Sequence, residues 1–407
     1  MKTNETTPIP QGYKATPLGI IPQEWEIYDF DRIVIRSQSH YLPNPQIHLR
    51  CIELEHLSQG DGSILGYIDS AEQKSMKNEF EEGDVLFGKL RPYLRKYWLA
   101  KFRGVCSTEI WVLRAISDVC TKEYLFDIIS SYNFVQKANV SSGSKMPRAE
   151  WDYVSKIPIL TPPLAEQRKI AEVLGLWDKA IEKQSQLIEQ LTLRKRGLMQ
   201  QLLTAKRRLP GFSGPWKTFQ IKDFAFEINL RNKDSIVYEV LSCTKYEGLV
   251  SSLEYFGKQI YSEDLSSYKI VPRNCFAYAT NHIEEGSIGY QLKYNNALIS
   301  PMYTVFGTDS KCVDDVFLYK LLKTQRLIYL YKSHMEGSID RRGGLRWKDF
   351  SIIKLAIPSI IEQTAIAQVL TAADREIELA QQKLELLRQQ KRGLMQQLLT
   401  GKKRVKY

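Results

Sequence analysis

The stretch Lys195-Arg-Gly-Leu-Met-Gln-Gln-Leu-Leu-Thr204 occurs a second time, without a single change, as Lys391 to Thr400. The likeness continues upstream at the same offset of 196 residues, where Glu166-Gln167 corresponds to Glu362-Gln363. A gapless repeat of this length indicates a tandem duplication of one structural unit. We therefore expect a pseudo-twofold internal repeat, in which a variable globular part is followed twice by a nearly constant helix.

Both copies of the repeat place their seam residues at alternating spacings of four and three residues, the pattern of a coiled coil. A proline stop precedes each helix, at Pro162-Pro163 and at Pro358, which fits a helix start there. The other interpretation is an amphipathic helix lying on a globular core. The apolar positions of the predicted seam are Ile170, Leu174, Trp177, Ile181, Ile188, Leu191 and Leu198 in the first helix, and Ile366, Leu370, Ile377, Leu384, Leu387 and Leu394 in the second.

The polar seam positions favour an antiparallel coiled coil. A parallel pair in register would set Lys195 against Lys391 and gather the basic ends of both helices together, and both arrangements are costly. In an antiparallel pair Ile170 would face Leu398. Lys391 would then lie beside Trp177, where its stem could pack on the indole while its ammonium reaches solvent.

The regions outside the helices predict α+β domains, because short strand-like runs precede helical segments in each half. The fold class is thus α+β, with two mixed α/β globular domains joined by two long helices. Strands are expected near residues 84–87, 109–113, 238–241 and 302–306, and helices near 122–132 and 314–329. The predicted boundaries are a first domain at 1–161, a central helix at 162–207, a second domain at 208–357 and a C-terminal helix at 358–407.

Composition limits the class of protein. The 407 residues contain no apolar run that approaches the ~18 residues of a membrane span, and the polar start of the chain does not resemble a signal peptide. The six cysteines and five histidines show no metal-binding spacing. We expect a reduced, cytoplasmic protein that needs no metal or cofactor and no membrane.

The net charge of +11 is concentrated at the C-terminal ends of the two predicted helices. One turn of basic residues would complement the helix dipole, but these clusters are larger, so a contact with phosphates or with an acidic partner is an equal alternative. The clusters comprise Arg194, Lys195, Arg196, Lys206, Arg207 and Arg208, and then Arg388, Lys391, Arg392, Lys402, Lys403, Arg404 and Lys406.

Motifs that resemble catalytic ones fail in detail. Gly83-x4-Gly88-Lys89 resembles a phosphate-binding loop, but Leu90 stands where a magnesium-binding hydroxyl is required. Thr161-Pro162-Pro163-Leu164 resembles the motif of amino-methyltransferases but lacks its amide or acid and its aromatic residue. The sequence therefore predicts a protein without catalytic residues.

Polar, basic and aromatic residues on two pairs of loops are the candidates for DNA contacts. Asn, Arg, Lys and His side chains can hydrogen-bond to base edges, and cations flanked by glycine can approach a phosphate closely. A plain solvated loop is the alternative for any single residue. The candidates are Lys89, Arg91, Tyr93, Arg95, Lys96, Lys145 and Arg148 in the first copy, and Tyr278, Asn281, His282, Arg341 and Arg342 in the second.

The chain resembles the specificity subunits of type I restriction-modification enzymes. The resemblance rests on Gly83-Asp-Val-Leu-Phe-Gly-Lys-Leu-Arg-Pro-Tyr-Leu94, on Pro162-Pro-Leu-Ala-Glu-Gln167 with its shortened copy at Pro358 to Gln363, and on Leu209-Pro-Gly-Phe212. It covers essentially the whole chain. The second copy departs from the pattern between Asn274 and Glu285, where the Gly-Asp and Arg-Pro of the first copy are missing.

The resemblance implies a non-catalytic subunit with two target recognition domains, each reading one half of a bipartite, asymmetric site in double-stranded DNA. It also implies that the paired helices act as a spacer and dock two methyltransferase subunits, and that restriction subunits can join the complex. Two other functions are compatible with the residues alone. One is a stand-alone DNA-binding regulator, which would bind its site tightly without a methyltransferase partner. The other is a structural scaffold, which would show no salt-dependent affinity for DNA.

Overall fold

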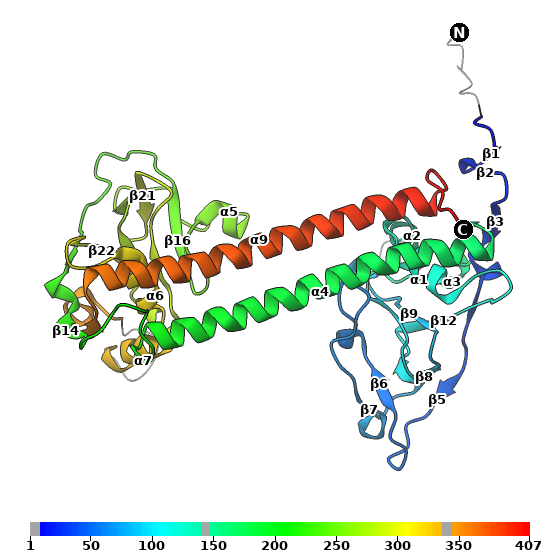
Figure 1. Cartoon of the computed structure of the whole chain (residues 1–407), viewed down its shortest axis with the longest axis horizontal. Helices are drawn as coiled ribbons and strands as arrows, with labels where there is room; N and C mark the ends of the chain where they lie inside the picture. The colour runs from blue at the N-terminus through cyan, green and yellow to red at the C-terminus, as the bar shows by residue number, and fades with distance from the viewer. Residues whose placement is uncertain (1–8, 140–145, 336–343) are drawn as a thin grey trace, which may run out of the picture. The chain divides into compact units, whose positions relative to one another are not determined.

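A computed structural model describes residues 9–139, 146–335 and 344–407. The chain divides into two compact units, each of which contains parts of both long helices. Unit 1 comprises residues 1–186 and 382–407, and unit 2 comprises residues 187–381. Among the described residues, no helix is both long enough and apolar enough to cross a membrane. The helices are α1 (Lys122–Ser130), α2 (Tyr132–Ala138), α3 (Trp151–Val154), α4 (Leu164–Leu202), α5 (Ser252–Phe256), α6 (Asp315–Leu322), α7 (Gln325–His334), α8 (Trp347–Phe350) and α9 (Ile360–Leu399) (Figure 1).

The globular part of unit 1, called head 1 below, covers residues 9–161 and is built on small sheets. A four-stranded sheet has the order β10-β9-β12-β4, and a five-stranded sheet has the order β5-β8-β11-β6-β7. The pairs β1-β2 and β13-β3 form two further sheets. The strands are β1 (Tyr13–Thr16), β2 (Gly19–Pro22), β3 (Glu26–Asp29), β4 (Val34–Arg36), β5 (His40–Tyr41), β6 (Arg50–Ile52), β7 (Ile68–Asp69), β8 (Lys77–Phe80), β9 (Val85–Gly88), β10 (Tyr97–Leu99), β11 (Gly104–Ser107), β12 (Ile110–Ala115) and β13 (Pro158–Thr161).

The globular part of unit 2, called head 2, covers residues 208–357 and repeats the four-stranded sheet and most of the five-stranded one, whereas β1-β2 and β5 have no counterpart among its described strands. Its sheets have the orders β15-β22-β19-β20, β17-β16-β21-β18 and β14-β23, and the parallel pair β16-β21 corresponds to β6-β11 of head 1. Strands β14, β15, β19 and β20 follow β3, β4, β9 and β10 at a constant offset of 191 residues. The strands are β14 (Lys217–Gln220), β15 (Ala225–Glu227), β16 (Val240–Thr244), β17 (Gly248–Ser251), β18 (Lys269–Pro272), β19 (Phe276–Ala279), β20 (Ile288–Tyr290), β21 (Asn296–Ile299), β22 (Tyr303–Thr308) and β23 (Lys354–Ile357).

Each predicted element exists, with small shifts at its ends. The four predicted strands correspond to β9, β12, β16 and β22, and the first predicted helix corresponds to α1. The second predicted helix is divided into α6 and α7 at Lys323-Thr324, because α6 ends at Leu322 and Thr324 is the extended residue that precedes α7. The α+β fold class is confirmed.

The helices pair in an antiparallel manner within each unit, as predicted. In unit 1 the core around Ile170 and Leu174 of α4 also contains Met395 and Leu398, from the end of α9. In unit 2 the end of α4, at Leu202, joins the core formed around Ile366 and Leu370 at the start of α9. Every predicted apolar seam residue is buried or half-buried. Exposed leucines such as Leu176 and Leu386 lie off the seam.

Candidate nucleic-acid interface

The first candidate loop of head 1 follows β9 and is held by backbone hydrogen bonds to two other segments. The amide of Lys89 donates to the carbonyl of Glu109 at 3.0 Å, and the amide of Ala149 donates to the carbonyl of Lys89 at 2.8 Å. The amide of Arg91 donates to the carbonyl of Pro147 at 2.7 Å, and Arg91 has a left-handed backbone with φ of 52°. These bonds bring the two predicted loops of head 1, around Lys89 and around Arg148, into one place.

A charged hollow of about 250 Å³ opens between these loops. Lys89 and Arg148 line it together with Arg36, whose guanidinium lies 4.8 Å from the centre of the Trp151 ring. Arg148 also pairs with Glu109 at 3.1 Å, which orients its guanidinium. Arg36 and Glu109 are not among the contact residues predicted from the sequence. Arg36 is a cation at the last position of the strand β4, and this position could have identified it as a candidate.

Two of the predicted contact residues in head 1 are engaged inside the domain instead. Arg95 donates from Nη2 to the carbonyl of Ser130 at 3.0 Å, and Lys96 donates from Nζ to the carbonyl of Leu54 at 2.5 Å. Both bonds support the packing of the loop, and we no longer count these two cations among the expected DNA contacts. Tyr93 is 51% exposed and stays a candidate.

The matching loop of head 2 has a different chemistry. At the offset of 191 residues, Thr280 takes the place of Lys89 and His282 the place of Arg91. The hydrogen bonds agree with this equivalence. The amide of Leu345 donates to the carbonyl of Thr280 at 3.0 Å, just as the amide of Ala149 donates to the carbonyl of Lys89. The 3₁₀ turn η6 (Ile283–Glu285) follows. The basic loop of head 1 is therefore replaced by a loop with one histidine and two acids.

Tyr278 is not a contact residue, which corrects the prediction. It is fully buried in the core of head 2, and burial raises the pKa of its phenol. Strand β19 is buried at all four positions because both faces of its sheet are covered, so Tyr278 cannot point to solvent. Asn281 is half-buried and His282 exposed, and both remain candidates. Lys145, Arg341 and Arg342 lie outside the described residues.

One group of metal-ligand type occurs among the described residues, and it was not predicted from the sequence. Ligand atoms of His282, Glu284 and Glu285 lie within 4.8 Å of one another in η6 and just before it. Nδ1 of His282 lies 3.5 Å from Oε1 of Glu285. Exposed carboxylates often gather without an ion, and we assign no metal to this group.

The two seam lysines lie in ion pairs, and the expectation that the Lys391 ammonium reaches solvent is wrong. In unit 1, Nζ of Lys391 donates to Oδ1 of Asp178 at 2.5 Å, and the lysine side chain is only 14% exposed. In unit 2 the same pair recurs at the offset of 196 residues, as Lys195 with Asp374. A charge is easier to bury beside an opposite charge than alone, which explains why this seam position tolerates a lysine.

The heads place different groups beside these two pairs. In unit 2, Lys320 of α6 also binds Asp374; burial raises the pKa of Asp374, but hydrogen bonds from Lys195 and Lys320 outweigh it and leave this pKa lowered. In unit 1, α1 supplies Asp127 near Lys391. Burial raises the pKa of Asp127 well above its usual value, although Lys391 opposes this, and its Oδ2 has no partner among the described residues. The helix pair is thus the same in both units, whereas the residue facing it is a lysine in unit 2 and an aspartic acid in unit 1.

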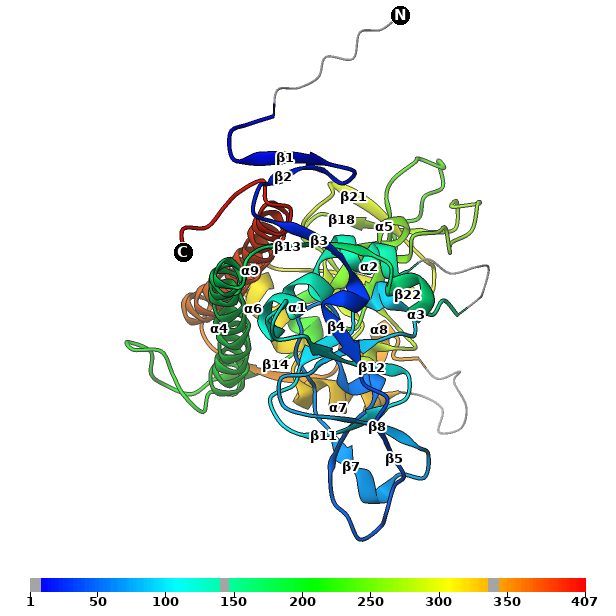
Figure 2. The same ribbon diagram turned by 90° about the vertical axis from the view of Figure 1, so that its right-hand side faces the viewer.

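A second ion pair closes each unit at the helix ends. Glu166 is fully buried at the start of α4 and accepts hydrogen bonds from Nε1 of Trp25 at 2.9 Å and from Nε of Arg404 at 2.5 Å. The tail after α9 therefore lies beside the β1-β2 hairpin, as Figure 2 shows. In unit 2, Arg208 binds the buried Glu362 in the same manner.

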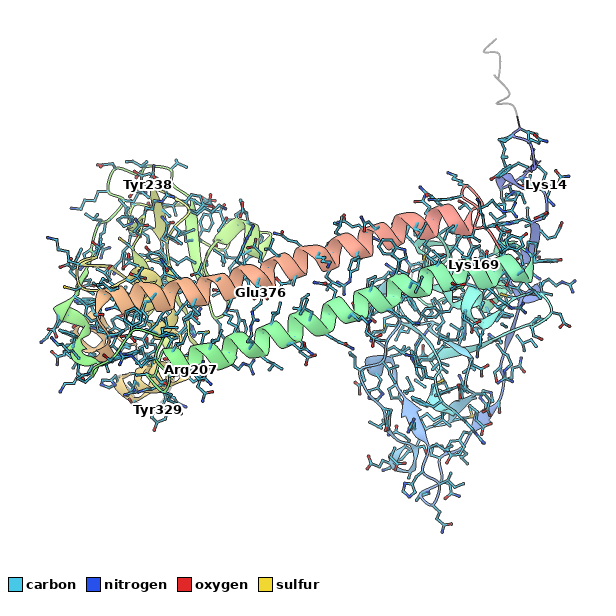
Figure 3. The ribbon with its side chains drawn as sticks, viewed as in Figure 1. Lys14, Lys169, Arg207, Tyr238, Tyr329 and Glu376 are labelled. Atoms are coloured by element: carbon cyan, nitrogen blue, oxygen red, sulfur yellow. The ribbon has the colours of Figure 1, made fainter. Side chains whose placement is uncertain are left out.

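These pairs account for part of the basic charge at the helix ends. Arg194 pairs with Glu376, which is labelled on α9 in Figure 3, and Arg392 pairs with Glu385. Together with Lys195, Arg208, Lys391 and Arg404, six of the predicted basic residues bind carboxylates of their own unit. Arg207, labelled just beyond α4 in Figure 3, and Lys406 are exposed.

Comparisons with known proteins agree with this geometry. A family model, the type I restriction modification DNA specificity domain, matches residues 56–193. A putative type I restriction enzyme MjaX specificity subunit of Methanocaldococcus jannaschii is 25% identical over 97% of both chains. The specificity subunit of the type I enzyme EcoDI of Escherichia coli is 32% identical over 42% of this chain and 39% of its own.

This chain belongs to the type I restriction-modification specificity subunits. As such a specificity subunit, it is the non-catalytic member of its enzyme. Solved structures share its fold, among them the HsdS subunit from Thermoanaerobacter tengcongensis, with a TM-score of 0.51, 17% identity and coverage of 94% of this chain and 98% of that one. A chain from a structure concerned with complex assembly and conformational transition of the type I R-M system has a TM-score of 0.61 at 16% identity and covers 94% of this specificity subunit and 99% of that chain.

Proposed function

We propose that this specificity subunit binds a bipartite, asymmetric site in double-stranded DNA, with one half-site read by each head. The observation that carries this proposal is the offset of 191 residues between the heads. It preserves strands and turns but replaces Lys89 and Arg91 by Thr280 and His282. Two readers with one topology and different side chains recognise two different sequences, since base specificity resides in side chains that reach the base edges.

The two long helices dock two methyltransferase subunits, and restriction subunits can join this complex in the cytoplasm. The relatives named above support this part of the proposal, because they are subunits of multi-subunit restriction enzymes. The methyl donor, and any nucleotide used for restriction, would be bound by the partner subunits.

The test is a map of methylated bases in host DNA with and without the gene, repeated after exchange of residues 1–161 for the same region of a relative. The proposal expects an interrupted methylated sequence that depends on the gene, and a change in only one half of it after the exchange. If both halves change, the heads do not read independently. If the purified chain binds its site tightly and no methylation depends on it, it is a stand-alone regulator.

A further inference from the structure

Head 2 contains a hollow of about 340 Å³ whose lining is neutral and aromatic. Tyr261, Tyr268 and Tyr303 contribute rings, and Ser242, Thr280 and Asn281 contribute hydrogen-bonding groups. Among the described residues that line it there is no Lys, Arg, Asp or Glu. His282 also lines it, so the hollow offers an imidazole, but no Lys or Arg to a phosphate and no carboxylate to a metal ion. Its volume lies in the range of small-molecule sites, roughly 300–1,000 Å³.

The polar groups of the hollow are held in place by their neighbours. Oγ1 of Thr280 donates to the carbonyl of Met302 at 2.9 Å and lies 3.1 Å from Oδ1 of Asn281. Gly344 closes the other side, because a Cβ there would come within 2.8 Å of Oδ1 of Asn281. The Asn281 side-chain amide, which lines the hollow, is thereby held against Thr280.

Beside their equivalent loops, the two heads have hollows that suit different ligands. The hollow of head 1 is lined by the cations Arg36, Lys89 and Arg148, which suit phosphates and guanine edges, and also by the acids Glu150 and Asp152. In head 2 the equivalent of Lys89 is Thr280, and it lines the neutral hollow. Aromatic rings that can stack on a flat face, next to an amide that can bind an edge, form the usual site for a nucleobase outside the helical stack.

We propose that the neutral hollow of head 2 takes up one nucleobase, unstacked from the half-site that head 2 reads, with the Asn281 side-chain amide hydrogen-bonding to its edge. The inference rests on the proposed function, since it requires that head 2 faces DNA. Extruding a base costs a few kcal/mol of stacking and pairing, and this cost is lower where the base is already mispaired. A mismatch opposite the extruded base should therefore strengthen binding, whereas a mismatch at a base read inside the duplex weakens it.

The experiment uses the specificity subunit assembled with its methyltransferase subunits and synthetic duplexes with a single mismatch at each position of the mapped half-sites. We expect one position in the half-site of head 2, distinct from the methylated base, at which the mismatch increases affinity several-fold. Met302→Trp, at a residue that is 60% exposed on the rim, should fill the hollow and abolish this increase. Asn281→Ala should lose discrimination at the same position. Leu90→Ala, the equivalent substitution in head 1, is the matched control and should leave that position unaffected.

The outcomes separate the two proposals. A methyltransferase subunit can extrude its own target base, so an increase at the methylated position that persists in Met302→Trp belongs to that subunit. If this is the only increase, or if Asn281→Ala keeps full discrimination, the hollow does not bind a base while the bipartite recognition stands. If the complex recognises no bipartite site, both proposals are overturned. Thermal unfolding of each variant identifies a misfolded head, and Asn281→Ala decides the question if Met302→Trp fails to fold.

Discussion

Arg404, near the C-terminal end of the chain, donates two hydrogen bonds to Glu166, the fully buried carboxylate at the start of α4. Arg208 and Glu362 repeat this relationship in unit 2. The units differ in one respect: Trp25 also donates to Glu166, whereas Nε1 of its equivalent Trp216 is buried without a partner among the described residues. The same ion pair therefore stands in two environments.

Arg404→Ala should destabilise the subunit by about 3 kcal/mol, because it leaves the Glu166 carboxylate buried without a cation. Urea denaturation of the variant and of the unchanged protein measures the difference in their free energies of unfolding. Arg208→Ala is the matched variant and should cost more, because Glu362 keeps no indole donor. Equal losses in the two variants would show that Trp25 does not contribute to holding the buried charge.

Asp127→Asn should stabilise the subunit at neutral pH. The pKa of Asp127 is raised by burial, so the folded state binds its proton more tightly than the unfolded state does. Stability from this group is thus present at low pH and decreases as the pH rises from the ordinary Asp value toward the raised one. Thermal unfolding between pH 4 and 8 should show a smaller decrease with rising pH in the variant. If stability depends on pH equally in the variant and in the unchanged protein, the pKa of Asp127 does not change on folding.

Asp374→Asn should destabilise the subunit, with an effect of opposite pH dependence. The pKa of Asp374 is lowered in the folded state, where Lys195 and Lys320 bind it against the effect of burial. Its contribution is present above the ordinary Asp pKa and is lost as the pH falls through the lowered value. The difference in stability from the unchanged protein should therefore shrink below about pH 4. A difference that stays constant down to pH 3 would contradict the assignment.

Arg91→Ala and Arg148→Ala should weaken or relax reading of the half-site of head 1 and leave the other half-site intact. An arginine that reads a base edge contributes about 1–3 kcal/mol of discrimination, whereas a phosphate contact changes the salt slope by about one. Binding titrations at several salt concentrations distinguish these two roles. Lys96→Ala is a useful comparison, since Lys96 binds the carbonyl of Leu54 and should affect stability rather than discrimination. Unchanged affinity, slope and specificity in both arginine variants would remove this hollow from the interface.

Four residues inserted after Glu189 should disturb the register of the helix pair, because the seam repeats every seven residues. A matching insertion after Glu385 should restore pairing and lengthen both helices by about 6 Å. The doubly extended protein should then accept a longer spacer between unchanged half-sites, which methylation mapping detects. If it assembles and still methylates only the original spacing, the helices do not determine that spacing.

The helices could be predicted from the sequence because their period and their repetition are local properties. Ile170 and Leu398 share a core because the period of the seam, and the cost of facing lysines, allow only the antiparallel pairing. The partner of Lys391 was missed, although Asp178 directly follows the predicted neighbour Trp177 and recurs as Asp374. An acid beside a seam lysine, repeated at the same offset, is the signal that would have found it.

The contact residues were harder to predict because their orientation depends on the surrounding fold. Arg91 and Arg95 lie four residues apart on the same loop and both have left-handed backbones, yet only Arg95 turns inward to the Ser130 carbonyl. Nothing in the local sequence separates these two arginines. Tyr278 lies in the apolar run Phe276 to Ala279, which forms a strand that is buried at all four positions. Burial on both faces is decided by which other segments cover the sheet.

The identical decapeptide at Lys195 to Thr204 and Lys391 to Thr400 also has a consequence for the gene. A crossover between the two coding stretches would join them in frame and remove 196 codons, which correspond to one complete head with one complete helix. The one remaining helix of the product would carry Asp178 in its first half and the lysine of the repeat, Lys195 or Lys391, in its second half. An aspartate and a lysine at these positions pair in each unit. Two copies of such a product have the complementary groups needed to pair with each other. On the proposed function, recombination at this repeat would convert a reader of two different half-sites into one that reads the same half-site twice.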